Sequence, residues 1–258
     1  MRPLWTGAIG FGLVNIPVKL FSATSDSELD LDMLDKKDHA HIRYIRVNEK
    51  TGKEIAWENI VKGYKLNNQY VILDDKDFES ANAVKTKVIE ISDFVDEKEI
   101  DSIYFETPYY LAPDKSGDRA YALLREALLK TGKVGIASFV MRNKESLAIL
   151  RASDNIIILN RMRFAEEVRA TNEITVPAKT TVKPGELKMA ISLINQLSGK
   201  FDIKQYKDTY TAQLLKIIKA KSKGTKTTAA PLKIVHSRTK DLMEQLKASL
   251  GNKRKKAS

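Results

Sequence analysis

Hydrophobic and polar residues alternate through most of the first two-thirds of the chain, the pattern of β-strands with one buried face. The segment 5–24, WTGAIGFGLVNIPVKLFSAT, predicts an opening strand that begins with glycines and is kinked at Pro17. Short runs separated by turns every ten residues or so predict a closed or nearly closed barrel. These further strands are predicted at 42–48, 54–61, 70–73, 88–95, 134–141, 145–152 and 156–160.

Turn residues predict two hairpins among these strands. Residues 49–53, Glu-Lys-Thr-Gly-Lys, separate 42–48 from 54–61, and residues 142–144 separate 134–141 from 145–152. A helix is predicted over 118–130, where Gly132 supplies a stop signal. Its expected apolar stripe is Ala120, Leu123, Leu124, Ala127 and Leu128.

The last third of the chain is predicted to be helical. Pro184 opens one predicted helix that Gly199 closes, and a second helix is predicted over 203–220. Residues 221–231 have the composition of a flexible basic linker, and a short amphipathic helix over 237–250 follows. The fold class is therefore α+β, a β-barrel core followed by helices and a basic tail.

Composition narrows the range of functions. The 258 residues include no cysteine, so disulfides, thiol catalysis and cysteine-ligated zinc are excluded, and a reducing cytoplasm is the expected setting. The net charge of +11 belongs to the end of the chain: 13 Lys or Arg face two acids from Gln213 onward, which leaves 31 of each in residues 1–212. Such a tail is attracted to polyanions.

No catalytic pattern emerges from the sequence. A phosphate-binding Gly-rich loop is missing, and three histidines give no triad or metal spacing. One cluster of acids at a predicted strand end is a candidate magnesium site for a nuclease, but acids in that position are usually solvated. These acids are Asp93, Asp96, Glu97, Glu99 and Asp101. We therefore expect a binding protein with no catalytic residue, no metal and no cofactor.

Three stretches carry a family resemblance. The opening string W-x-G-x-I-x-F-G-L-V-x-I-P-V, together with KGYKLNNQYVIL at 62–73 and EIDSIYFETPYYLAP at 99–113, resembles the bacterial Ku proteins. The resemblance extends from Trp5 to about Lys219. It implies a non-enzymatic homodimeric ring that threads onto linear double-stranded DNA ends without sequence specificity. It also implies recruitment and stimulation of ligase D in non-homologous end joining of double-strand breaks, at the nucleoid in the bacterial cytoplasm.

The resemblance also implies a domain layout. Residues 1–183 would form the Ku barrel core, with an excursion at about 25–65 that encircles DNA. Residues 184–221 would form a helical arm that stabilises the dimer, and 222–258 a linker, a ligase-recruiting helix and a basic tail. Folded as a two-stranded ribbon, roughly 20 residues per strand would reach about 65 Å.

Basic residues of the excursion, the second hairpin and the tail are the candidate phosphate contacts. They are Arg43, Arg46, Lys50, Lys53, Lys62, Lys65, Arg142, Lys144, Lys253, Arg254, Lys255 and Lys256. Arg43 and Arg46 are three residues apart, so on a regular strand only one of them would face the DNA. Solubilising residues at ordinary turns are the alternative interpretation.

Two apolar sets are candidate protein contacts. The arm set consists of Leu187, Ile191, Ile194, Tyr206 and Tyr210, which packing in an intramolecular core would explain equally well. The ligase-binding set consists of Leu242, Met243, Leu246 and Leu250, on a helix too short to be stable alone. That helix would dock in a groove of the ligase or pack on the core.

Two rival functions remain open from the sequence. One is an open DNA-compacting protein that binds through its basic tail and ignores ends. The other is the metal-dependent nuclease that the acidic cluster would serve.

Overall fold

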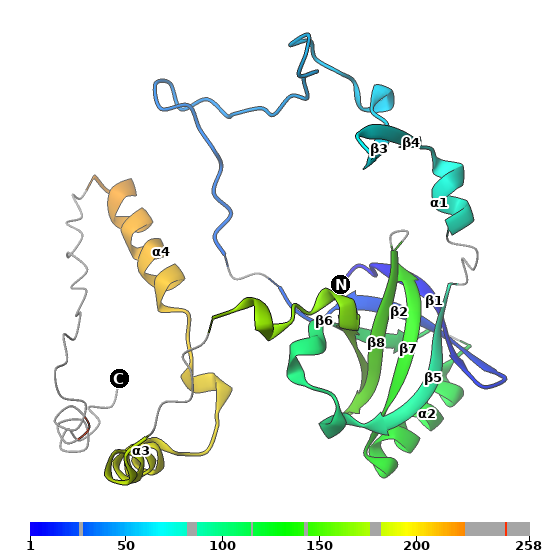
Figure 1. Cartoon of the computed structure of the whole chain (residues 1–258), viewed down its shortest axis with the longest axis vertical. Helices are drawn as coiled ribbons and strands as arrows, with labels where there is room; N and C mark the ends of the chain where they lie inside the picture. The colour runs from blue at the N-terminus through cyan, green and yellow to red at the C-terminus, as the bar shows by residue number, and fades with distance from the viewer. Residues whose placement is uncertain are drawn as a thin grey trace. The chain divides into compact units, whose positions relative to one another are not determined.

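The computed structural model describes residues 1–25, 28–81, 87–114, 116–141, 144–175, 182–224 and Leu246. The chain divides into two compact units (Figure 1). The first comprises 1–26 and 30–171, and the second comprises 27–29 and 172–258. Each unit is described by itself.

A closed barrel of seven strands forms the centre of the first unit, as the strand pattern predicted. The strands are β1 (Trp5–Phe11), β2 (Val14–Ser22), β5 (Val88–Asp96), β6 (Phe105–Pro113), β7 (Lys133–Met141), β8 (Lys144–Ser153) and β9 (Ile156–Met162). Around the barrel they run in the order β1-β2-β6-β9-β8-β7-β5. All neighbouring strands are antiparallel except β1 and β5, which pair in parallel over three residues and close the sheet.

The opening segment forms a hairpin, so the prediction of one strand kinked at Pro17 is wrong. Phe11 pairs with Val14, and Gly12 and Leu13 make the two-residue turn. Gly12 has a φ of +59°, the conformation that such tight turns require and that glycine adopts without strain. Leu13 at the turn is fully exposed, although it continues the apolar alternation of the sequence.

The barrel interior holds the main hydrophobic core, and helix α2 (Asp118–Thr131) contributes side chains to it. From α2 the buried side chains are Tyr121, Leu124 and Leu128, spaced one helical turn apart. The predicted stripe was therefore wrong at Leu123, which is 67% exposed, and at Ala127, also exposed. Gly132 ends the helix as predicted, with a φ of +66° and its N–H donated to the Leu128 carbonyl. The strands supply Ile9, Ile16, Val18, Leu20, Ile89, Tyr109, Leu111, Ala137, Phe139, Ala148, Leu150, Ile157 and Leu159.

A second, smaller core lies on the opposite face of β7, β8 and β9. Val134, Ile149 and Met162 are buried there. The segment that joins β5 to β6, with its 3-10 turns η2 (Glu97–Glu99) and η3 (Ser102–Tyr104), covers them. This cover explains why β8 and β9 are apolar on both faces, a pattern typical of strands packed on two sides.

Residues 30–81, here called the insert, lie between β2 and β5 and differ most from prediction. The expected strands 42–48 and 54–61 reduce to one bridge, Val47 with Glu54, and a second bridge joins Leu34 to His41. The predicted turn is present, closed by hydrogen bonds from Asn48 to Lys53 and from Gly52 to Asn48. The prediction that 25–65 folds as a two-stranded ribbon is therefore wrong. The physical reason is that two strands without a third strand or a packed face are only marginally stable. Figure 1 traces the insert as a largely extended chain.

The C-terminal part of the insert has regular structure. A 3-10 turn η1 (Trp57–Asn59) precedes the hairpin of β3 (Lys62–Leu66) and β4 (Gln69–Leu73), followed by helix α1 (Asp75–Ala81). The strand predicted at 70–73 is thus confirmed, but it pairs with β3 in a separate sheet and not with the barrel.

The second unit contains helices α3 (Pro184–Leu197) and α4 (Thr209–Ser222). Pro184 opens α3 as predicted. The second predicted helix begins later than 203, because Asp208 caps α4 by accepting the Thr211 N–H at 3.1 Å. A short 3-10 turn, η6 (Ile203–Gln205), precedes it. The helix predicted at 237–250 lies outside the described residues except for Leu246. Among the helices described, none combines the length and apolarity that a membrane crossing would need.

Candidate nucleic-acid interface

The insert carries six of the candidate phosphate contacts, and all six are exposed. Lys50 and Lys53 lie at the tight turn, where the Asn48 carboxamide oxygen accepts the backbone N–H groups of Lys50 and Thr51. The other four are Arg43 and Arg46 before the turn, and Lys62 and Lys65 on β3. Residues 36–65 hold eight Lys or Arg against four acids, so this exposed stretch has a local excess of positive charge.

Two of these basic groups lie over aromatic rings that the sequence interpretation missed. The Arg46 guanidinium carbon is 4.6 Å from the centre of the Trp57 ring. The Lys62 ammonium nitrogen is 4.5 Å from the centre of the Phe78 ring. Such cation–π contacts fix a basic group in place without a carboxylate partner. In the sequence, the only indication of the Arg46–Trp57 contact is that the two residues lie on the two sides of the turn at 48–53.

Large apolar side chains are exposed all along the insert. They are Leu31, Met33, Leu34, Ile42, Tyr44, Ile45, Val47, Trp57, Ile60, Val61, Tyr64, Leu66, Tyr70, Val71 and Ile72. A monomeric protein rarely exposes apolar residues so densely, and a surface of this kind marks an interaction site.

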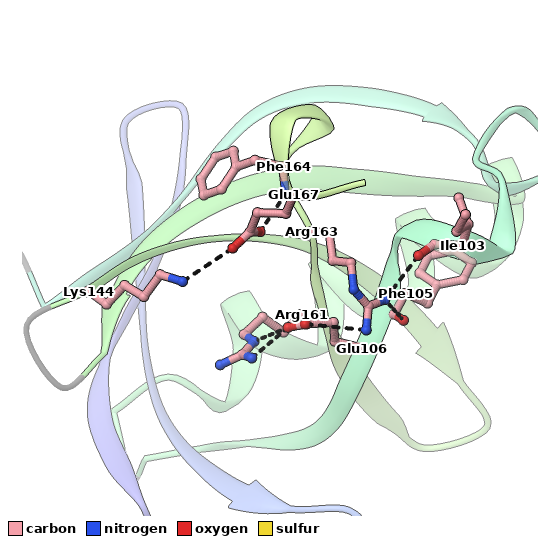
Figure 2. A network of polar contacts seen from close by, with 8 residues as sticks. All are labelled: Ile103, Phe105, Glu106, Lys144, Arg161, Arg163, Phe164 and Glu167. Atoms are coloured by element: carbon pink, nitrogen blue, oxygen red, sulfur yellow. Dashed lines mark hydrogen bonds and ion pairs between the residues drawn. The ribbon is translucent and has the colours of Figure 1, made fainter. Parts of the chain in front are cut away.

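The second hairpin presents a different situation. Its predicted strands pair as β7 and β8, and Lys144 begins β8. The Lys144 ammonium pairs with the Glu167 carboxylate at 3.3 Å (Figure 2). Glu167 also accepts the Phe164 backbone N–H at 2.9 Å, and this bond, with the contribution of Lys144, lowers the pKa of the Glu167 carboxyl. Lys144 is therefore partly neutralised in the free chain. Arg142 lies outside the described residues.

Two further arginines near Lys144 are engaged by Glu106 on β6. The Arg161 Nε donates to Glu106 at 2.6 Å, and the Arg163 guanidinium lies 3.5 Å from the same carboxylate. Arg163 also donates to the carbonyls of Ile103 and Phe105, at 2.9 Å each (Figure 2). Arg161 thus joins β9 to β6, and Arg163, just after β9, joins the chain there to β6 and to the segment between β5 and β6. Their bonds indicate a structural role.

The acidic cluster has no metal-binding geometry in the described part of the chain. Asp96 pairs with Lys133 at 3.4 Å, and Asp101 caps η3 by accepting the Ile103 N–H. Asp96, Glu97 and Glu99 line an open hollow of about 690 Å³ beside Thr131 and Gly132. No three His, Asp or Glu residues among those described converge as a metal site would require. The geometry gives the nuclease alternative no support.

The arm residues are exposed in the single chain. Leu187, Ile191 and Ile194 lie on α3, Tyr210 lies on α4, and Tyr206 lies between η6 and α4. Within the described part of the chain, neither α3 nor α4 buries a residue. Of the ligase-binding set, Leu246 is helical and half-buried. Outside the described residues are Leu242, Met243, Leu250, Lys253, Arg254, Lys255 and Lys256.

Comparison with known proteins decides the family. The family model of the Ku70/Ku80 β-barrel domain matches residues 10–189, more than half of the chain. The chain belongs to the Ku family. Its Ku barrel is the seven-stranded barrel described above, and the family match also takes in the insert and the start of α3.

Three curated relatives extend this similarity over nearly the whole chain, and each bears the name non-homologous end joining protein Ku. The Coxiella burnetii protein is 41% identical, over 98% of this chain and 96% of its own length. The Bacillus subtilis protein is 41% identical, over 99% of this chain and 83% of its own length. The Archaeoglobus fulgidus protein is 40% identical, over 97% of this chain and 98% of its own length.

Proposed function

We propose that this Ku chain forms a homodimeric ring that threads onto linear double-stranded DNA ends in non-homologous end joining. In this role it is a scaffold without catalytic activity that binds DNA irrespective of sequence and recruits and stimulates ligase D. The observation that carries the proposal is a long, exposed, basic insert attached to a Ku barrel. The names of the relatives, all end-joining proteins, support the repair role. Its place of action would be the bacterial nucleoid.

Sequence-independent binding is consistent with the chemistry of the insert. Its candidate contacts are lysines and arginines at turns and on a short hairpin, residue types that commonly bind phosphate oxygens, and phosphate contacts carry no sequence information. A protein that binds in this way releases counterions, so its affinity falls steeply as salt rises. A ring needs no chemistry specific to an end, since only a free end lets it thread.

The homodimer is supported by apolar surface that the described part of the chain leaves uncovered. The insert exposes the fifteen large apolar residues given above, and α3 exposes Leu187, Ile191, Ile194 and Leu197. Helices of 14 residues such as α3 and α4 are marginal without a packed apolar face. A second copy that covers these faces would give both the ring and the arm contacts.

Ligase recruitment is proposed for the final segment. Leu242, Met243, Leu246 and Leu250 have the spacing of one apolar helix face, and helix-in-groove docking uses such anchors. The basic residues 253–256 would add non-specific attraction to DNA.

A gel-shift titration with one duplex, in linear and in covalently closed circular form, tests the ring. The expected result is binding to the linear form and none to the circle of the same sequence, because a closed ring cannot load without an end. Equal binding to both forms would contradict threading and would favour the compacting protein. Magnesium-dependent cleavage of either form would instead favour the nuclease. Light scattering on the free protein should give twice the mass of one chain.

A further inference from the structure

The basic residues of the described chain differ in the groups that their side chains contact. Lys144, Arg161 and Arg163 are each close to a carboxylate, which neutralises them locally. Arg46 has no carboxylate or carbonyl acceptor within the described residues, yet its guanidinium is held over the Trp57 ring. Arg46 therefore combines a fixed position with unused hydrogen-bond donors.

Backbone contacts on both sides fix the Arg46–Trp57 pair. The Arg46 carbonyl accepts the Ile55 N–H at 2.9 Å, next to the bridge between Val47 and Glu54. Trp57 lies two residues after Ile55 and begins η1. The Ile60 N–H closes this turn by donating to the Trp57 carbonyl at 3.1 Å. The indole is 71% exposed. Neither residue belongs to either core cluster of the described chain.

From this geometry we infer that Trp57 is a positioning residue that holds the Arg46 guanidinium as a preorganised clamp for a DNA phosphate. The inference rests on the proposed function. An aromatic face attracts a guanidinium electrostatically and leaves N–H groups free, and a guanidinium binds phosphate through two parallel hydrogen bonds. Holding the side chain in advance reduces the rotamer entropy lost on binding. Lys50, at the same turn, has no ring partner in the described chain and would bind phosphate as a mobile point charge.

A double-mutant cycle on the full-length protein tests this inference. The variants are Arg46→Gln, Trp57→Leu and both together, with Kd for a labelled linear duplex measured over a range of salt. Arg46→Gln should weaken binding and reduce the salt slope by about 0.9 for each phosphate that the variant no longer neutralises. Trp57→Leu should weaken binding about two- to fivefold for each copy of the clamp. The double variant should bind no more weakly than Arg46→Gln alone.

Two controls separate positioning from a general loss of structure. Trp57→Phe keeps an aromatic face and should restore most of the affinity that Trp57→Leu loses. Lys50→Gln should weaken binding by the same factor whether residue 57 is Trp or Leu, because Lys50 does not use the ring. Light scattering should show the same oligomeric state for every variant.

Independent effects of Arg46→Gln and Trp57→Leu would overturn the inference, and so would a change of oligomeric state in Trp57→Leu. Either result, obtained while the unaltered protein still binds linear duplex, would refute the positioning role of Trp57 without contradicting the proposed function. Failure of the unaltered protein to bind linear duplex would remove both.

Discussion

At the scale of single residues, Gly7 shows why the opening motif is glycine-rich. Trp5 lies on the same face of β1, and its indole packs edge-to-face on Phe139 with ring centres 6.4 Å apart. A Cβ added at Gly7 would overlap both this indole and the Lys87 carbonyl oxygen at the seam where β1 meets β5. Gly7→Ala should therefore destabilise the fold by about 1–3 kcal/mol, measured by urea unfolding.

Gly199 provides the matched control for this substitution. A Cβ there would meet no atom within 4 Å, so Gly199→Ala should leave the free energy of unfolding nearly unchanged. If the two variants unfold at the same urea concentration, the close packing at Gly7 does not limit stability.

Tyr121 is a second residue whose loss has a defined cost. Its buried hydroxyl donates to the Leu111 carbonyl at 2.6 Å and accepts the Ile157 N–H at 2.7 Å, joining α2 to β6 and β9. Tyr121→Phe would leave the Ile157 N–H without its partner and should cost about 1–3 kcal/mol in urea unfolding near neutral pH. Tyr110→Phe is the control, since no hydrogen bond of the Tyr110 hydroxyl is found within the described chain and its loss should cost much less.

The same residue predicts a dependence on pH. Burial raises the pKa of Tyr121 above its usual 10.0, because the phenolate would lose its hydration. A raised folded-state pKa gives stability that is complete below pH 10.0 and is lost as the pH rises above it. The difference in unfolding free energy between the unaltered protein and Tyr121→Phe should therefore shrink above that pH. A difference that stays constant would contradict this account.

At the scale of elements, the β7–β8 hairpin offers a test of charge masking. Glu167→Gln would remove the negative partner of Lys144 but keep an oxygen that accepts the Phe164 N–H. If Lys144 binds DNA, this change should strengthen binding roughly two- to fivefold and steepen the salt slope. Because the Glu167 pKa is lowered, its charge and this effect should persist at pH values down to the usual 4.5. The measurement is Kd for linear duplex, and in a Lys144→Gln background the gain should disappear.

Elements were predictable where local pattern and tertiary packing agree. The hairpin of β7 and β8 combines alternating residues with a polar turn, and α2 ends at Gly132, so both were predicted nearly to the residue. Leu123 was misassigned because Tyr121, with a polar tip, takes the buried position and the helix is rotated accordingly. The insert was misassigned because its alternating residues face no core within the described part of the chain. Its apolar pattern is the pattern of an uncovered surface.

The candidate site was predictable only in part, because local sequence pattern does not show which distant residues come into contact. Exposed lysines at a turn can be found from sequence, as at Lys50 and Lys53. Whether a basic group is paired depends on contacts between distant residues, as with Lys144 and Glu167, 23 positions apart. For Arg46 and Trp57, the sequence offers only their placement on the two sides of the turn at 48–53, and the structure shows that the two side chains meet there.

At the scale of the whole molecule, the proposed function predicts that the ring and the tail contribute separately to DNA binding. Residues 222–258 hold ten Lys or Arg and two acids, so much of the net charge of +11 lies beyond α4. A tail of this kind attracts any DNA, linear or circular, through counterion release. Under the proposed function, threading would depend on the barrel and the insert, which the tail does not contain.

Removal of residues 222–258 should therefore leave the preference for linear over closed circular duplex intact. The affinity for linear duplex and its salt slope should both fall, because the truncated protein neutralises fewer phosphates. Stimulation of ligase D should disappear with the apolar face of residues 242–250. The measurements are gel shifts of both DNA forms and a ligation assay with the truncated protein. If the truncated protein binds neither form while its barrel still unfolds cooperatively, the tail is the DNA-binding element and the chain coats DNA without encircling it.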